Sequence, residues 1–351
     1  MASPKKRVTL RDIAREAGVH FTTVGLALQG SPQLPAATKS RIRAVAEKLG
    51  YRPDPMLSAL NAYRQSRMRP RYQATIAWIN NWPDREALHR IQEFQDYYDG
   101  ARQRAEEKGY ALEEFWLHEK GMTPQRLSKV LRARNIETLL MAPQPAAHAV
   151  PPLNYEDFAV VAFGYSLQPA VFHVVTNHHF HSMNLLLEHL QALGYARIGF
   201  VGELIWNEKV DNAWLGGLAL ARLKNPQTGK IPPLFEDAHI ERTLPIWLKR
   251  HRPDVVISHR YMLTRLRGVG CRIPEEIGFA GLGVDRSNSD ISGIYQNSER
   301  IGRAAVDFVI SMLHNGERGV PDVPTRMLIE STWNPGKTLR PERQRASRRA
   351  S

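Results

Sequence analysis

Apolar residues in the first fifty positions recur every three or four residues, which is the spacing of amphipathic helices. A first helix is expected after Thr9, which can cap it, and Gly18 can take the left-handed conformation that ends it. A second helix is expected to begin near His20, and a third spans roughly 36–49. Two short helices that meet at a glycine and pack on a third form a helix-turn-helix unit.

The second helix of this unit is expected to bury only some of its side chains and to expose the others. Val24 and Leu28, one turn apart, are expected to face inward. The positions expected to face outward, where a partner can reach them, are Phe21, Thr22, Gly25 and Leu26. An ordinary helical bundle with no partner is the alternative explanation of the pattern.

The distribution of charge separates these two interpretations. Residues 1–72 carry 14 Lys and Arg against 4 Asp and Glu, and residues 336–351 carry 6 against 1, in a chain whose net charge is +13. The residues between are therefore slightly acidic. A basic unit on a near-neutral body is expected of a protein that binds duplex DNA, because Lys and Arg displace counterions from phosphates. We predict a DNA-binding headpiece.

A short apolar segment follows the third helix. Pro53 and Pro55 end that helix, and Met56, Leu57 and Leu60 then lie on one side of a new helical turn. One interpretation is a linker helix that packs on its neighbour. The other is a wedge that inserts a leucine into the minor groove and kinks the duplex.

The remaining residues alternate between strand and helix patterns. Strands are expected at 74–79, 110–117, 138–142, 158–162, 197–201, 255–258 and 277–280. Helices are expected at 94–108, 123–134, 183–193, 214–223, 244–250 and 301–314. This order predicts parallel sheets covered by helices on both faces, and about 280 residues are enough for two α/β lobes.

The predicted organisation has four parts. They are a headpiece at 1–52, a hinge helix and linker at 53–72, a two-lobed core at 73–336 and a basic, disordered tail at 337–351. Cys271 is the only cysteine, so no intrachain disulfide forms and a reducing cytosol is expected. No signal peptide or long apolar run is seen, which argues against secretion and against a membrane span.

The helix-turn-helix, the third helix and the segment Gly50-Tyr51-Arg52-Pro53 together resemble the lactose repressor (LacI/GalR) family of bacterial transcription regulators. Segments 190–200, 253–257 and 273–278 extend the resemblance into the second lobe. It implies a repressor-type homodimer whose headpieces read a pseudo-palindromic operator in double-stranded DNA. It also implies a core like a periplasmic binding protein that binds a small-molecule effector, with no cofactor, in the cytoplasm at the bacterial nucleoid.

The resemblance also implies which residues meet DNA. Carried over by position, the base readers are Phe21, Thr22 and Leu26, the phosphate contacts are Thr9 and Thr23, and the minor-groove residues are Leu57 and Leu60. The chain departs from the family at His20, Gly25 and Leu26, where relatives usually have Ser, Ser and often Arg. Leu26 cannot make the bidentate guanine contact of an arginine, so its readout must be apolar and the operator atypical.

The effector residues depart further from the family. Where relatives have a pocket Asp, Arg, Asn-Asp and Asp, this chain has Asn177, Ala213, Arg260-Tyr261 and Gly283, with Asp285 as a displaced substitute. A sugar or related metabolite is the family default. The candidate contacts, expected at strand ends near a cleft, are Asn80, Trp82, Asn177, Trp206, Arg260, Asp285 and Gln296. A structural role is an equal alternative for each of them.

Other chemistry finds little support. No metal site is expected at His173, His178, His179 and His181, because no cysteine or acidic ligand has tetrahedral-site spacing. The chain lacks a P-loop, a nucleophile elbow and a dinucleotide fingerprint, which argues against an enzyme. The main competing function is a small-molecule sensor whose headpiece no longer discriminates sequence, an interpretation favoured by Gly25 and Leu26. The basic tail is either a solubilising end or an auxiliary phosphate contact.

Overall fold

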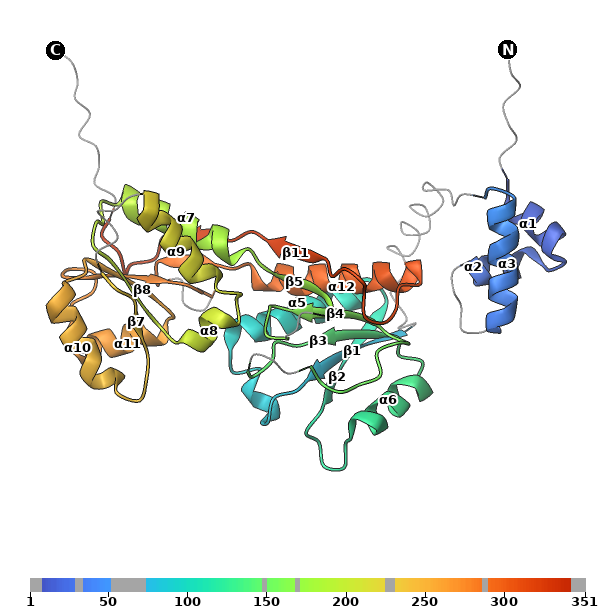
Figure 1. The fold of residues 1–351 in the computed structure, drawn as a ribbon, viewed down its shortest axis with the longest axis horizontal. Coiled ribbons are helices and arrows are strands. Elements are labelled where there is room, and N and C mark those ends of the chain that lie inside the picture. Colours follow the sequence, from blue (N-terminus) through green and yellow to red (C-terminus); the bar gives the residue numbers. More distant parts are fainter. Residues whose placement is uncertain are drawn as a thin grey trace, which may run out of the picture.

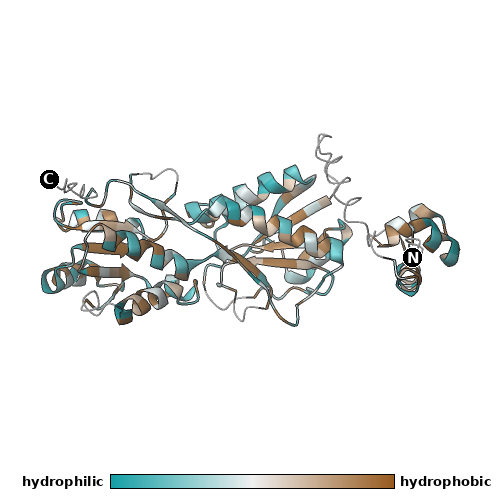
Figure 2. Ribbon diagram, turned by 90° about the horizontal axis from the view of Figure 1, so that it is seen from above, coloured by the Kyte–Doolittle hydropathy of each residue, from teal (hydrophilic) through white to brown (hydrophobic). Residues whose placement is uncertain are grey.

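The computed structural model describes residues 8–28, 34–51, 74–146, 150–167, 171–224, 231–285 and 290–341. These residues form a helical headpiece and two α/β lobes (Figure 1). In Figure 2 the strands inside both lobes are largely apolar, whereas polar positions concentrate on the helices that cover them. Within the described ranges, no helix is long and apolar enough to cross a membrane.

The headpiece has the three helices that the sequence predicts. They are α1 (Leu10–Ala17), α2 (Phe21–Leu28) and α3 (Ala36–Lys48). Ile13 of α1, Val24 and Ala27 of α2, and Ile42 of α3 are fully buried in a common core. The expectation that Leu28 is buried was only partly right. Ala27 takes the fully buried position and Leu28 packs at the edge of the core.

The first lobe is built on a six-stranded parallel sheet in the order β11-β5-β4-β3-β1-β2. Its strands are β1 (Ala74–Asn80), β2 (Tyr110–Trp116), β3 (Thr138–Met141), β4 (Ala159–Phe163), β5 (His173–Asn177) and β11 (Arg326–Ile329). Side chains of β1 alternate between two apolar layers. Those of Ile76 and Trp78 face a cluster with α5 (Gln92–Glu107) and α12 (Ser298–Asn315), and those of Ala77 and Ile79 face α6 (Pro124–Ala133).

The second lobe also has six strands, in the order β12-β10-β9-β8-β6-β7. Its sheet is not fully parallel as predicted, because the edge strand β12 pairs antiparallel with β10 while the other pairs are parallel. Its strands are β6 (Ile198–Gly202), β7 (Leu234–Phe235), β8 (Val255–Ser258), β9 (Gly278–Gly281), β10 (Gly293–Tyr295) and β12 (Thr332–Asn334). One face packs on α7 (His179–Ala192) and α9 (Ala213–Lys224), and the other on α10 (Ile240–His251) and α11 (Tyr261–Gly268). Two short helices, η1 (Arg85–Ala87) and α8 (Leu204–Glu208), follow β1 and β6.

The two lobes are interleaved in sequence. Within the described residues the chain passes between them after β5, after β10 and between β11 and β12. Helix α12 thereby returns to the first lobe and lies against α5 (Figure 1). The two helices touch backbone to backbone, since a Cβ added at Gly302 would lie 2.1 Å from the Tyr97 carbonyl oxygen. Residues from both halves of the chain thus complete the first lobe.

Most predicted elements are present within a few residues of their expected bounds. Eight further elements were not predicted from the sequence, namely β5, β7, β10, β11, β12, η1, α8 and α11. The predicted start of the tail at residue 337 was wrong. Thr338 and Leu339 are buried, and the Thr338 hydroxyl donates to the Phe279 carbonyl oxygen at 2.7 Å. The core therefore continues at least to Leu339.

Candidate DNA-binding headpiece and interlobe cleft

The start of α1 is held by Thr9 and Asp12. The Thr9 backbone N–H and hydroxyl both donate to one Asp12 carboxylate oxygen, at 2.9 and 2.7 Å. Gly18 ends the helix at φ 63°, in the left-handed region that the sequence predicts. Thr9 therefore lies at a helix N-terminus, where backbone N–H groups and the helix dipole favour an anion such as a phosphate.

The start of α2 carries an exposed aromatic and hydroxyl cluster. Phe21 is 41% exposed, and its ring lies 4.4 Å from that of His20. The Nδ1 atom of His20 lies within hydrogen-bond distance of the Thr22 hydroxyl, at 2.8 Å. The Arg11 guanidinium lies over the Phe21 ring at 5.8 Å. His20 was not predicted to contact DNA. The one sign in the sequence was that His20 stands where members of the family usually have Ser.

The remaining DNA-contact candidates are less exposed or lie elsewhere. Thr23 and Leu26 are partly buried, and Leu26 is not part of the apolar core of the described headpiece. Gly25 faces open space, since an added Cβ would meet nothing within 4 Å. Leu57 and Leu60 lie outside the described residues.

A cavity of about 70 Å³ lies between the two lobes. It is found where β4, β5 and β8 end, at the carboxyl edge of both sheets, which is the usual ligand position in α/β proteins. Aromatic side chains form much of its wall, and both lobes contribute to it. Its lining includes Glu93, Phe94, Thr176, His179, Trp206, Lys209, His259 and Gln296.

Lys209 places its ammonium group between the lobes. Its side chain is 8% exposed, and Nζ lies 4.5 Å from the Trp206 ring centroid and 5.4 Å from that of Trp82. Burial lowers the pKa of Lys209 to about 8. Among the described residues, the ammonium group makes no hydrogen bond or ion pair, and its contacts are the two indole rings.

Two further polar groups on the cavity wall are buried without a hydrogen-bond partner in the described part of the chain. They are the Thr176 hydroxyl and Nδ1 of His179. Burial, and then the neighbouring His178, lower the pKa of His179 to about 3. Burial also lowers the pKa of His259 to about 4. Both imidazoles are therefore neutral at neutral pH and can donate or accept a hydrogen bond.

Glu93 contributes a carboxyl group to the opposite side of the cavity. Burial raises its pKa, and the nearby Asp285 carboxylate raises it further, while Arg260 acts in the other direction. A carboxyl group with a raised pKa is more readily protonated, and a protonated carboxyl can donate a hydrogen bond. The cavity thus offers both donors and acceptors.

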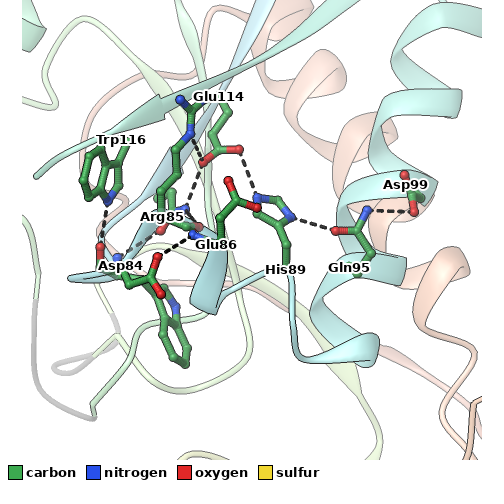
Figure 3. Close-up of polar contacts among 10 residues, drawn as sticks. Asp84, Arg85, Glu86, His89, Gln95, Asp99, Glu114 and Trp116 are labelled. Carbon is green, nitrogen blue, oxygen red and sulfur yellow. Dashed lines mark hydrogen bonds and ion pairs between the residues drawn. The ribbon is translucent and has the colours of Figure 1, made fainter. Parts of the chain in front are cut away.

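Asn80 and Glu114 hold the loop that carries Trp82. Figure 3 shows the Glu114 carboxylate bonded to both Arg85 and His89. The Asn80 amide donates to Glu114 Oε1 at 2.9 Å and to the Arg85 carbonyl, and its oxygen accepts from the Trp82 backbone N–H. Glu114 Oε2 lies 3.0 Å from His89 Nε2. Burial alone would raise the pKa of Glu114, but the hydrogen bonds from His89 and Asn80 hold it below its usual value. Asn80 therefore supports the cleft wall from behind.

Asn177 ties the three crossovers together. Its amide donates to the carbonyl oxygens of Ile329 and Gln296 and to the Ser331 hydroxyl, at 3.0, 3.4 and 2.7 Å. Its own oxygen accepts from the Ser182 hydroxyl at 2.8 Å. The hydrogen-bonding capacity of this side chain is therefore engaged in the hinge between the lobes.

The other effector candidates are divided between the cavity and its supports. Trp206 and Gln296 line the cavity, and Trp82 lies beside it across Lys209. Arg260 donates to Asp285 at 3.1 Å, in a pair whose carboxylate is buried and whose guanidinium is half exposed. Two of the seven predicted residues therefore line the cavity and Trp82 lies beside it, whereas Asn80, Asn177, Arg260 and Asp285 are bonded to other protein groups.

The premise that no acidic side chain accompanies the histidine cluster was wrong. The crossover between β11 and β12 brings an acidic side chain, Glu330, to the histidine cluster. His178, His181 and Glu330 place three potential metal-ligand atoms within 4.8 Å of one another. The carboxylate is hydrogen-bonded to both imidazoles, at 3.0 Å from His178 Nδ1 and 2.5 Å from His181 Nδ1, so these groups satisfy one another without an ion.

Comparisons with known proteins agree with this architecture. Residues 9–54 match the family model described as bacterial regulatory proteins, lacI family, and residues 187–338 match a periplasmic binding protein-like domain. The HTH-type transcriptional regulator PtxS of Pseudomonas putida is 24% identical over 353 residues, covering 95% of this chain and 98% of that protein. PtxS of Pseudomonas plecoglossicida is 46% identical over 65 residues, which is 18% of this chain and 19% of the relative.

A solved structure supports the same fold over nearly the whole chain. The lac repressor dimer bound to operator and the anti-inducer ONPF superposes with a TM-score of 0.55 at 18% identity, covering 95% of this chain and 100% of that one. The two family models and the full-length relative fall on the headpiece and the lobes described above. Residues 9–54 therefore form a headpiece of the lacI family of bacterial regulatory proteins on periplasmic binding protein-like lobes, and the chain is a DNA-binding transcription regulator.

Proposed function

We propose that this protein is a repressor that binds a pseudo-palindromic operator as a homodimer and releases or retains it according to a small molecule in the interlobe cleft. The observation that carries the proposal is the face of α2, where Phe21 and Thr22 are exposed on a helix packed rigidly against α1 and α3. In a helix-turn-helix protein, this is the helix that enters the major groove.

The headpiece supports a division of labour among its residues. Phe21, Thr22 and Leu26 read bases, and the apolar surface of Leu26 fits a thymine methyl group. Thr9 and Thr23 contact phosphates. His20 is added to the base-reading set because it is exposed and lies beside the Thr22 hydroxyl. Leu57 and Leu60 remain candidates for the minor-groove wedge from the sequence alone.

The cleft supports effector binding through a smaller set than the sequence suggested. Trp206 and Gln296 are proposed to contact the ligand, and Trp82 to close over it with Lys209. Asn80, Asn177, Arg260 and Asp285 are proposed to hold these walls and the hinge in place. The family default for the ligand is a sugar or related metabolite.

Control of DNA binding follows from linkage between the two sites. A ligand that fits one separation of the lobes better than another shifts the population toward it, and the shift changes the spacing of the two headpieces. The protein acts by binding and not by catalysis, in the cytoplasm at the nucleoid. The lac repressor in complex with operator and the anti-inducer ONPF is a solved protein of this fold in which DNA and a small molecule are held together.

Selection of bound sequences from random duplexes, followed by a screen of metabolites for release, tests the proposal. The expected result is one enriched palindrome with half-sites about one helical turn apart, from which at least one small molecule releases or tightens the protein. A sensor whose headpiece no longer discriminates would enrich no sequence at constant salt while still binding the small molecule. That outcome would favour the alternative suggested by Gly25 and Leu26.

A further inference from the structure

The position of Lys209 is fixed by the turn that follows α8. Its backbone N–H donates to the Ile205 carbonyl at 3.0 Å. The neighbouring Asn207 side chain donates to Asn212 Oδ1 at 2.7 Å and accepts from the Leu215 backbone N–H at 3.1 Å. These bonds fix the turn between α8 and α9, so the backbone of Lys209 has a defined position at the cleft, and its ammonium group lies against the two indole rings.

The surroundings of this ammonium group do not compensate its burial. Moving a charged amine out of water carries a large desolvation cost. Contact with an indole ring offsets only part of that cost, and Lys209 has two such contacts. Its three N–H donors have no acceptor among the described residues, and Glu203 acts on it only at longer range. The group lacks an anionic acceptor.

We propose that the ligand of this cleft is a small hydroxylated carboxylate, whose carboxylate group binds Lys209 and whose hydroxyls meet Thr176 and His179. The proposal rests on the proposed effector function and names its chemical class. Thr176 and His179 each present a buried polar atom that lacks a partner in the described part of the chain. A hydroxyl satisfies both kinds of atom because it donates and accepts.

A carboxylate fits this cavity better than a phosphate does. Lys209 is the sole Lys or Arg among the described residues that line it. A phosphate carries up to two charges and is usually met by several donors or by the N-terminus of a helix. The cavity also holds the Glu93 carboxyl, whose pKa is raised by burial, so its lining matches at most a single negative charge on an otherwise uncharged molecule.

The size of the cavity links this ligand to lobe movement. About 70 Å³ holds a few water molecules, whereas small-molecule sites are usually 300–1,000 Å³. A hydroxylated carboxylate of several carbons therefore requires the lobes to separate from their present position. Lys209 lies between Trp82 of the first lobe and Trp206 of the second, so a ligand on Lys209 changes the contact between the lobes directly.

Matched acids and alcohols test the proposal by calorimetry on the full-length protein. The pairs are D-gluconate with D-glucitol and 4-hydroxybenzoate with 4-hydroxybenzyl alcohol, each up to 10 mM, with inorganic phosphate as a competing anion. We expect at least one acid to bind at least tenfold more tightly than its alcohol. Lys209→Met, which keeps the length and packs on both indoles, should remove that preference, and Lys209→Arg should retain it.

Several results would overturn the proposal. They are equal binding of acid and alcohol, undiminished binding of the acid by Lys209→Met, displacement of the acid by equimolar phosphate, and no binding of either acid at 10 mM. Thr176→Val keeps the shape of its side chain and tests the hydroxyl contact. It should weaken the hydroxylated acid and leave an unhydroxylated acid such as hexanoate unchanged, and equal effects on both would remove Thr176 from the site.

The same compounds separate this inference from the proposed function. A neutral compound that releases the operator, while no acid binds, would leave effector control standing and end the carboxylate assignment. An acid that depends on Lys209 for binding but never changes operator affinity would support the carboxylate assignment and contradict effector control.

Discussion

The carboxyl group of Glu93 occupies the space beside Gly283, so that a Cβ added at position 283 would lie 2.0 Å from Glu93 Oε1. Glu93 lies in the first turn of α5 in the first lobe, and Gly283 follows β9 in the second. The family resemblance places an aspartate at position 283. In this chain an acidic group reaches the same region from the opposite lobe, and the lobes can touch there because residue 283 has no side chain.

Gly283→Ala should weaken the contact between the lobes, because the new methyl group displaces the Glu93 carboxyl. The displaced atom ends a flexible side chain, so the loss in unfolding free energy should be about 1 kcal/mol, at the low end for overpacking. Glu93→Ala should remove most of this effect. A double-mutant cycle in urea measures the coupling, and strictly additive losses would show that the two residues do not meet.

Asn177→Ala should lower the unfolding free energy by about 2–3 kcal/mol, since it leaves buried hydroxyl and carbonyl groups without their donor. Asn315→Ala, at an exposed position with one surface hydrogen bond, is the matched control and should stay within about 0.5 kcal/mol of the wild type. Urea unfolding followed by circular dichroism compares them. Equal losses would mean that Asn177 does not hold the crossovers.

Two glycines should respond in opposite directions to alanine. Gly302→Ala drives a methyl group into the Tyr97 backbone between α5 and α12, and should cost about 3 kcal/mol. Gly25→Ala adds a methyl group to open space on α2, and should stabilise that helix by up to about 1 kcal/mol. Thermal unfolding reports the first change, and amide exchange in the headpiece reports the second. Slower headpiece exchange is expected for Gly25→Ala, and faster exchange would contradict its open position.

Acid should destabilise the protein through His179. Its pKa is lowered to about 3 in the folded protein, whereas histidine in an unfolded chain titrates near 6.5. Below that value the unfolded state binds a proton that the folded state does not, so the unfolding free energy falls as the pH falls. Between pH 7 and pH 5 this loss amounts to about 2 kcal/mol. His179→Gln should lose about that much less over the same interval, and an unchanged pH dependence would contradict the burial of a neutral imidazole.

Base contacts and phosphate contacts should behave differently under mutation. Thr22→Val removes the hydroxyl beside His20, and should change the preference at particular base pairs. Neutralising Lys5 or Lys6, which the sequence places in the basic N-terminus, should weaken all duplexes alike and reduce the salt slope by about 0.9 for each phosphate that the protein no longer neutralises. Binding to a set of single-base operator variants at several salt concentrations measures both. Identical profiles for the two kinds of mutant would contradict the assignment.

Local signals in the sequence predicted the headpiece well. Thr9, Gly18 and Val24 act within one or two turns of the chain, so spacing alone located α1 and α2. The cleft was harder to predict, because its residues are brought together by crossovers far apart in sequence. Nothing in the sequence around Lys209 distinguishes it from a surface lysine, because its burial depends on Trp82 and Trp206 from different lobes. Similarly, Glu330 contacts His178 only because the chain crosses between the lobes after β11.

Short, exposed elements were also beyond a pattern-based prediction. In β11, Arg326, Met327 and Leu328 are exposed, so the strand has no apolar alternation and is defined by its pairing with β5. Asn177 lies at the end of β5, but the sequence could not show that its amide donates to two carbonyl oxygens and one hydroxyl of the hinge.

The central claim is that the headpiece discriminates DNA sequence. Its most direct test is the ratio of two dissociation constants, measured by fluorescence anisotropy at one salt concentration. One is for the duplex selected from random sequence, and the other is for a scrambled duplex of the same length and composition. The account predicts a ratio of about a thousand or more in favour of the selected duplex. A ratio near one would contradict it.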